Sequence, residues 1–200
     1  AVGTVLHPEI PQIGWFKGNR ILKTPVRGGR SVALCEFKGS IGGGVGAYWG
    51  DNGRILFATG SSGIYTVSEQ GGQISELIEP GVGYRDLHEP YALPDDRGVL
   101  FVSHPNLRRP GVLEVWRDGE RRILFEAPEN ARIYSPCYDD LGYILFRLTH
   151  SETTPGLWAM AFDDKAGEVG GEPFLVEPDA REATIDRNGN LVFVMSPHRS

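Results

Sequence analysis

Seven side chains in this sequence have the chemistry to bind an anionic ligand or a peptide. Arginine directs several N–H donors at a carboxylate, and histidine changes its charge near neutral pH. The candidates are Arg85, Asp86, His88, His104, Arg132, His150 and Arg181. His104 and His150 are comparable because each closely follows an aliphatic run that ends in an aromatic residue. We therefore predict a binding surface that uses histidine and arginine.

Other kinds of chemistry have little support in the sequence. A metal site on His104 and His150 needs a third ligand, and Ca²⁺ binding at 139–140 or 163–164 lacks the spaced oxygen ligands of a loop site. No serine has the spacing of a nucleophile elbow, and the glycines of 42–46 do not open a helix after a strand. We predict no catalytic residue, no bound metal and no cofactor.

The composition limits the kinds of molecule that this chain is expected to bind. The 200-residue chain has a formal net charge of −6, which argues against a protein that neutralises nucleic-acid phosphates. It contains no apolar run of about 18 residues, so we expect no insertion into a membrane. Protein, peptide or small-molecule partners remain.

A repeated sequence motif must form the elements that position these side chains. An Asp/Gly-rich turn followed by an aliphatic run that ends in Phe occurs at 51–57, 95–101, 139–146 and 186–193. The closing Phe residues are 44, 45 and 47 positions apart. A period near 45 with this pattern is typical of propeller blades. We interpret the repeated aspartates as turn-stabilising residues rather than ligands; they are Asp51, Asp95, Asp139 and Asp186.

The repeat predicts an all-β fold, a β-propeller of four-stranded antiparallel blades. The second repeat is the clearest, with strands expected at 45–49, 54–59, 64–67 and 74–78. In the first repeat only three strands are recognisable, at 13–16, 20–26 and 31–37. The 200 residues form a single propeller domain or a fragment of one, with about four blades and a half blade. The approximate blades are 1–38, 41–79, 82–126, 129–177 and the partial 180–195.

The four-stranded blade pattern predicts where the candidate residues lie. The loop between the second and third strands shares one face of a propeller with the connections between blades, so His104, His150 and the arginines belong to that face. His88 falls on an innermost strand near the central channel. The recurring Trp, Tyr and Phe residues are expected to pack between blades. Cys35 and Cys137 fall in different repeats and are expected to be buried, without a disulfide.

The repeat resembles the TolB-like, WD-like propeller repeat of bacteria. The likeness is carried by 46–58 and 60–65, by 20–29 in the blade before, and by Gly156–Asp163 in a late blade. The most similar regions are propellers attached to bacterial serine/threonine protein kinases. That resemblance implies a sensory role, and it favours an extracytoplasmic location for this segment. The kinase motifs themselves are absent from the sequence.

The sequence therefore predicts a non-catalytic binding or scaffold module, the sensory or protein-interaction part of a longer bacterial signalling protein. Three alternatives stay open. The first is a propeller hydrolase or lyase with its site at the channel mouth, and the second is the regulatory propeller of a serine peptidase. The third is a periplasmic partner of an envelope complex, which predicts a signal peptide upstream and a complete ring. In each case the blades either close into a small ring or form part of a ring of six or more.

Overall fold

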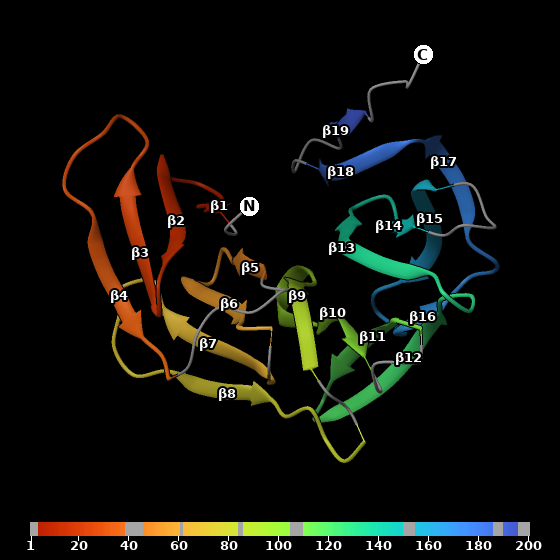
Figure 1. The fold of residues 1–200 in the computed structure, drawn as a ribbon, viewed down its shortest axis with the longest axis horizontal. Coiled ribbons are helices and arrows are strands. Elements are labelled where there is room, and N and C mark those ends of the chain that lie inside the picture. The colour runs from red at the N-terminus through yellow and green to blue at the C-terminus, as the bar shows by residue number, and fades with distance from the viewer. Residues whose placement is uncertain are drawn as a thin grey trace. The chain divides into compact units, whose positions relative to one another are not determined.

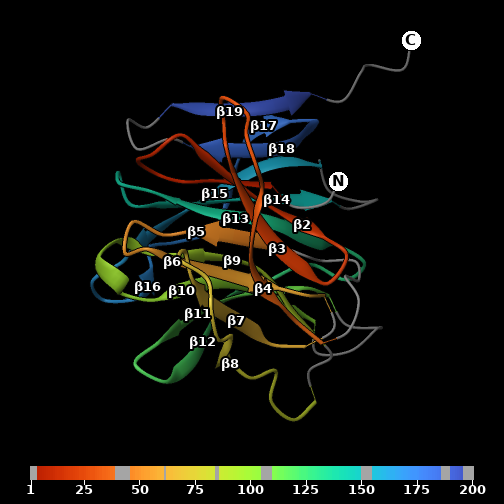
Figure 2. The same ribbon diagram turned by 90° about the vertical axis from the view of Figure 1, so that its left-hand side faces the viewer.

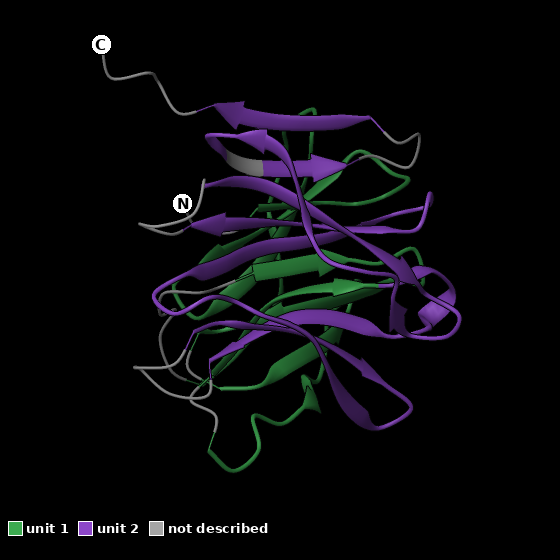
Figure 3. Ribbon diagram, turned by 90° about the vertical axis from the view of Figure 1, so that its right-hand side faces the viewer, with its two compact units in different colours: residues 1–92 green, residues 93–200 purple. Residues whose placement is uncertain are grey.

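A computed structural model of the chain describes residues 4–38, 46–60, 62–83, 86–104, 110–149, 155–185 and 190–195. Within these ranges the chain consists of β-strands joined by turns, and its one helical element is the 3-10 turn η1 (Pro94–Asp96). No helix among the described residues is long and apolar enough to cross a membrane. The chain divides into two compact units, residues 1–92 and 93–200 (Figure 3).

Unit 1 contains antiparallel sheets that follow the order of the chain (Figure 1). Its strands are β1 (Thr4–Leu6), β2 (Gln12–Lys17), β3 (Arg20–Pro25), β4 (Val32–Glu36), β5 (Gly46–Trp49), β6 (Arg54–Ala58), β7 (Ile64–Ser68), β8 (Ser75–Ile78) and β9 (Asp86–Ala92). One sheet has the order β1-β2-β3-β4, and its strands β2, β3 and β4 run alongside one another in Figure 2. A second sheet has the order β5-β6-β7-β8. Short turns suffice for both sheets because neighbouring strands are antiparallel.

Unit 2 repeats this arrangement. Its strands are β10 (Val99–His104), β11 (Val112–Arg117), β12 (Glu120–Glu126), β13 (Arg132–Asp139), β14 (Tyr143–Thr149), β15 (Gly156–Asp163), β16 (Glu168–Val169), β17 (Phe174–Pro178), β18 (Ala180–Ile185) and β19 (Leu191–Met195). One sheet has the order β12-β11-β10-β9. A second sheet has the order β13-β14-β15-β16, with β17 also paired to β15, and β18 pairs with β19.

The all-β prediction is confirmed, and so is the pattern of four-stranded antiparallel sheets. Each strand predicted for the second repeat lies within one residue of the observed bounds. The first repeat is more complete than predicted, because β1 pairs with β2 as a fourth strand. A strand of three residues is too short to show an alternating pattern, so β1 could not be predicted from the sequence. The boundaries of the blades stay a prediction.

Recurring aromatic and aliphatic residues form the core of each unit. In unit 1, Phe57 is fully buried and packs near Phe16, Phe37 and Tyr65. In unit 2, Phe101 and Phe146 are fully buried at the equivalent positions of their repeats. Burying side chains of this size contributes a large hydrophobic stabilisation, about 2–3 kcal/mol each. These Phe residues are therefore core residues, as predicted.

The repeated turn aspartates have two different conformations. In unit 2, Asp139 accepts backbone hydrogen bonds from Leu141 (2.9 Å) and Tyr143 (3.1 Å), which is the turn role predicted for it. Asp95 instead has left-handed backbone angles inside η1 and forms an ion pair with Arg97. This repeat lacks the expected turn glycine because Asp96 occupies its place. Asp186 lies outside the described residues.

Candidate functional site

Two predicted residues of unit 2 lie where β10 ends and β13 begins. His104 is the half-buried last residue of β10. A Cβ atom added at Gly111 would lie 3.4 Å from His104 Nε2 and 3.6 Å from the Ile133 amide nitrogen. The imidazole therefore lies beside the start of β13, where Arg132 is the first residue. The structure thus places His104 and Arg132 at one end of their sheets.

Arg132 is available for an interaction. It is exposed, and among the described residues no carboxylate forms an ion pair with its guanidinium. A guanidinium offers donors in a fixed fork that matches a carboxylate. Both residues belong to β-strands of unit 2, His104 at the end of β10 and Arg132 at the start of β13. We call His104, Gly111 and Arg132 the strand-end site.

Asp86 and His88 lie in unit 1 and are much less accessible. They are 5% and 2% exposed on β9, and their separation by two residues places them on the same face of the strand. His88 Nδ1 lies 3.6 Å from Glu89 Oε2. Such buried groups need partners within the protein rather than a ligand in solvent. Their role in binding stays a prediction.

The other predicted site residues cannot be placed. Arg85 and His150 lie outside the described residues. Arg181 belongs to β18, but its side chain also lies outside the described part. The metal alternative that pairs His104 with His150 therefore stays untested. Among the acidic pairs, Asp163 accepts backbone hydrogen bonds from Lys165 (2.9 Å) and Ala166 (3.0 Å), and these lower its pKa.

A buried polar network in unit 2 was not predicted from the sequence. Glu114 is 2% exposed, accepts a hydrogen bond from the fully buried Ser103 hydroxyl, and forms an ion pair with Arg121 at 2.6 Å. The Arg121 guanidinium also lies 5.3 Å from the centroid of the Phe101 ring. Glu114 stands opposite Phe101 in the strand register. At the equivalent position of two other sheets, Tyr65 lies opposite Phe57 in unit 1 and Trp158 lies opposite Phe146 in unit 2.

The network is structural rather than catalytic in form. Ser103 has no exposed surface, so a substrate cannot reach its hydroxyl. A buried carboxylate is tolerated only when its oxygens are hydrogen-bonded and its charge is paired, and Ser103 and Arg121 supply both. A charged residue inside the apolar run Val112–Trp116 was the available signal for this network.

A comparable polar cluster occurs in unit 1. His7 Nε2 and Glu69 Oε2 are 3.0 Å apart, and the Trp49 indole N–H donates to the same oxygen at 2.9 Å. The His7 and Trp49 rings pack edge to face. The indole hydrogen bond is the main cause of a lowered pKa at Glu69. His7 was not predicted as a site residue because it lies outside the repeated pattern.

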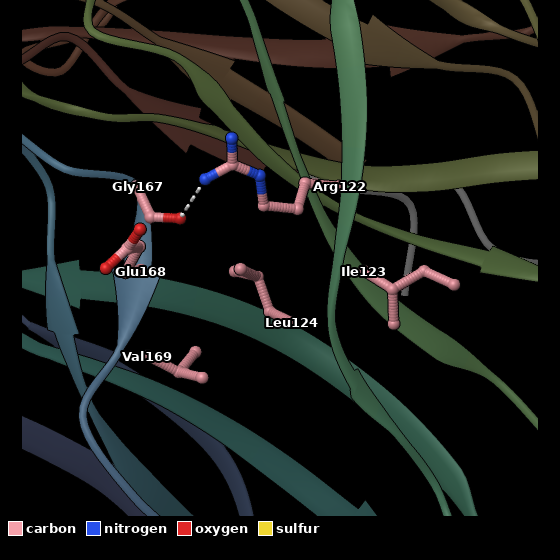
Figure 4. Close-up of a pocket in the computed structure, with 6 residues that line it drawn as sticks. All are labelled: Arg122, Ile123, Leu124, Gly167, Glu168 and Val169. Carbon is pink, nitrogen blue, oxygen red and sulfur yellow. Dashed lines mark hydrogen bonds between the residues drawn. The ribbon is translucent and has the colours of Figure 1, made fainter.

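Unit 2 also contains a surface groove between β12 and β16. Its cavity volume is about 440 Å³, and it is lined by Arg122, Ile123, Leu124, Gly167, Glu168 and Val169 (Figure 4). The Arg122 guanidinium donates to the Gly167 carbonyl oxygen at 3.2 Å. In Figure 4, Arg122 and Leu124 project towards β16, whereas Ile123 points the other way. This alternation follows from the pleat of a strand.

Arginines hold the turn that forms one wall of the groove. Arg97 forms an ion pair with Asp164 at 3.0 Å, and Arg117 donates to the Asp164 carbonyl oxygen at 3.1 Å. With Arg122, these contacts fix the β15–β16 turn against the sheet that contains β12. The groove is therefore built from restrained backbone on both sides.

Solved structures share this fold. A putative TolB from Agrobacterium tumefaciens matches 100% of this chain and 71% of its own, with a TM-score of 0.74 and 13% identity. A chain of a nidogen/laminin complex matches 97% of this chain and 71% of its own, with a TM-score of 0.68 and 14% identity. An oligogalacturonate lyase in complex with manganese matches 92% of this chain and 56% of its own, with a TM-score of 0.60 and 12% identity.

These similarities define the class of fold, and the chain is a β-propeller of antiparallel blades. The predicted TolB-like character is confirmed at that level, whereas the link to kinase-attached propellers stays a prediction. The chain spans 56% to 71% of the lengths of these three proteins. No family model and no curated protein sequence matches it.

Proposed function

We propose that this chain is a non-catalytic propeller module that binds a protein or peptide through the strand-end site. One observation carries the proposal. Arg132 is exposed without an ion-pair partner among the described residues, and it begins the strand beside which the His104 imidazole lies. An exposed guanidinium at the end of a sheet favours a ligand that carries a carboxylate.

The fold supports this function without specifying it. Packed strands hold their ends and loops rigidly, so those segments can vary without loss of the core. A TolB protein and a chain of a nidogen/laminin complex share the fold, which is consistent with a propeller that binds protein. Fold alone does not assign function.

The finer role rests on the repeat resemblance. Propellers attached to bacterial kinases suggest that this module is the sensory or scaffolding part of a longer signalling protein. The strand-end site would then detect a partner and transmit its binding to another domain. The extracytoplasmic location proposed for it has the same basis.

A random peptide library displayed on phage tests the proposal, with the purified chain as the immobilised target. We expect selected peptides to be enriched in Asp and Glu. Arg132→Glu should weaken their binding by about tenfold or more, which corresponds to about 1.4 kcal/mol. Glu129→Gln, an exposed change three residues before Arg132, serves as the control. Selected peptides that bind the Arg132→Glu variant as tightly as the original chain would refute the strand-end site.

The enzymatic alternative has a direct assay. An oligogalacturonate lyase shares the fold, so the chain should be incubated with oligogalacturonates with and without Mn²⁺. We expect no unsaturated product above the background reaction. Turnover that depends on the chain would replace the binding proposal with a lyase.

A further inference from the structure

The groove between β12 and β16 lies beside a free strand edge. β12 is the outermost strand of the order β12-β11-β10-β9, and among the described residues no strand pairs with its outer edge. In an antiparallel sheet, alternate residues of an edge strand direct their backbone N–H and C=O groups outward. Such an edge can accept one more strand.

The side chains of β12 would select the added strand. Arg122 faces the groove and is exposed, and among the described residues its only hydrogen bond is to a backbone carbonyl oxygen. Its positive charge therefore has no carboxylate partner there. Leu124 on the same face lines the groove but is only 9% exposed, and Val169 across the groove is 39% exposed. On the opposite face of β12, Ile123 is 49% exposed.

We propose that β12 binds an extended peptide segment of a partner protein by strand addition. The peptide places an acidic residue opposite Arg122 and apolar residues opposite Ile123 and Leu124. Its backbone pairs with the free edge, and its side chains enter the groove on one face and cover Ile123 on the other. This site is separate from the strand-end site and does not depend on the proposed function.

Cross-strand pairs between side chains would make the β12 edge specific for certain peptides. Residues directly opposite one another in antiparallel strands have Cβ atoms about 4.5–5.5 Å apart, which allows a carboxylate to reach a guanidinium. An opposite-charge pair at this place stabilises the complex, and a like-charge pair destabilises it. Arg122 therefore distinguishes acidic from basic peptides.

The test uses a fluorescent, end-capped peptide Thr-Val-Val-Asp-Val-Thr and its counterpart with Lys in place of Asp. Fluorescence anisotropy measures binding to the original chain and to Arg122→Glu. We expect the original chain to prefer the Asp peptide by about fivefold or more, and Arg122→Glu to reverse that preference. Both chains must show the same circular dichroism spectrum, since Arg122 also bonds to the Gly167 carbonyl. Arg54→Glu, the same change of charge at the exposed first residue of β6, is the control and should leave both affinities unchanged.

Two further peptides separate edge pairing from simple charge attraction. One has N-methylvaline in place of the second Val and the other has N-methylaspartate in place of Asp. The N–H groups of these adjacent residues point to opposite edges of a strand, so we expect one of the two changes to weaken binding by about fivefold or more. Equal binding of the Asp and Lys peptides, or no effect of N-methylation, would overturn the proposal. A concentration-dependent dimer of the chain that the Asp peptide does not dissociate would also overturn it, because a second copy would then occupy the edge.

Discussion

At the scale of single residues, Glu114 marks where one sheet departs from the pattern of the others. It occupies the position that Tyr65 and Trp158 occupy in their own sheets. Ser103 and Arg121 compensate for burying a charge there. A buried pair of this kind contributes little net stability, yet removing one partner leaves the other charge uncompensated.

Glu114→Gln should therefore destabilise the chain by about 3 kcal/mol, since Arg121 keeps a charge whose side chain is only 19% exposed. Urea denaturation measures the change in the free energy of unfolding. Glu120→Gln on the exposed start of β12 is the control and should change it by less than about 0.5 kcal/mol. The double variant Glu114→Leu/Arg121→Leu should recover most of the loss. A loss below about 1 kcal/mol in Glu114→Gln would show that the network is unimportant for stability.

Cys137 provides a pH dependence with a definite sign. Burial raises the pKa of its thiol to about 12, with a further contribution from Asp139. In the unfolded chain a thiol ionises near pH 8.5, so its stabilising contribution is complete below that pH and is lost as the pH rises towards 12. Burial raises the pKa of Tyr138 to about 12 as well, which acts in the same direction.

The free energy of unfolding should thus fall between about pH 8 and about pH 11, measured by urea denaturation. Cys137→Ala lacks the thiol and should show a smaller fall across this range, although it is less stable near neutral pH. An equally steep fall in the variant would assign the dependence to Tyr138 or other groups.

Residues that recur could be predicted from the sequence, and residues that deviate could not. The buried Phe57, Phe101 and Phe146 follow directly from the repeat. The turn role of Asp139 does too, because Asp before a glycine turn accepts local backbone hydrogen bonds. The proximity of His104 to the start of β13 could not be predicted, since it depends on packing between strands distant in the sequence.

At the scale of elements, a glycine precedes the third strand of three sheets. Gly63, Gly111 and Gly156 stand directly before or at the start of β7, β11 and β15. A Cβ atom at Gly63 would lie 2.1 Å from the Ile78 carbonyl oxygen, and one at Gly156 would lie 2.3 Å from the Glu177 carbonyl oxygen. At Gly111 the nearest atom would be 3.4 Å away. Close approach of the outermost strand explains the first two glycines.

Gly63→Ala and Gly156→Ala should therefore destabilise the chain by about 2 kcal/mol or more, because backbone of the adjacent strand must shift. Gly111→Ala is the matched control and should cost less than about 1 kcal/mol. Thermal and urea denaturation of the three variants measure the difference. Similar losses at all three positions would contradict the role assigned to close approach.

The elements themselves were largely predictable. Period-two alternation and turn residues located the strands of the second repeat within one residue. β1 and the two-residue β16 were missed because neither is long enough to carry a pattern. β16 nevertheless forms one wall of the groove, so the groove could not be derived from the sequence.

At the scale of the whole chain, the β18–β19 sheet differs from the larger ones. Val192 and Val194 are 64% and 56% exposed, and Phe193 is only half-buried, whereas Phe101 and Phe146 are fully buried in their sheets. Fewer buried apolar contacts lower the free energy of local opening. The two-stranded sheet should therefore open more readily than the rest of unit 2.

Hydrogen exchange measured by mass spectrometry tests this difference. Peptides from β19 should exchange at least about tenfold faster than those from β14 under native conditions. Adding the Asp hexapeptide proposed to bind β12 should leave that ratio unchanged, since β12 belongs to another sheet. Protection of β19 equal to that of β14 would show that the sheet is stabilised by contacts beyond the described residues.

The most direct test of the central claim, a binding module that uses the strand-end site, is photo-crosslinking in the source cells. A photoreactive amino acid replaces Glu129, three residues before Arg132, in one variant and Asp140, just beyond the other end of β13, in another. The account predicts that position 129 captures one protein or peptide that position 140 does not. Equal capture from both positions, or none from position 129, would contradict it.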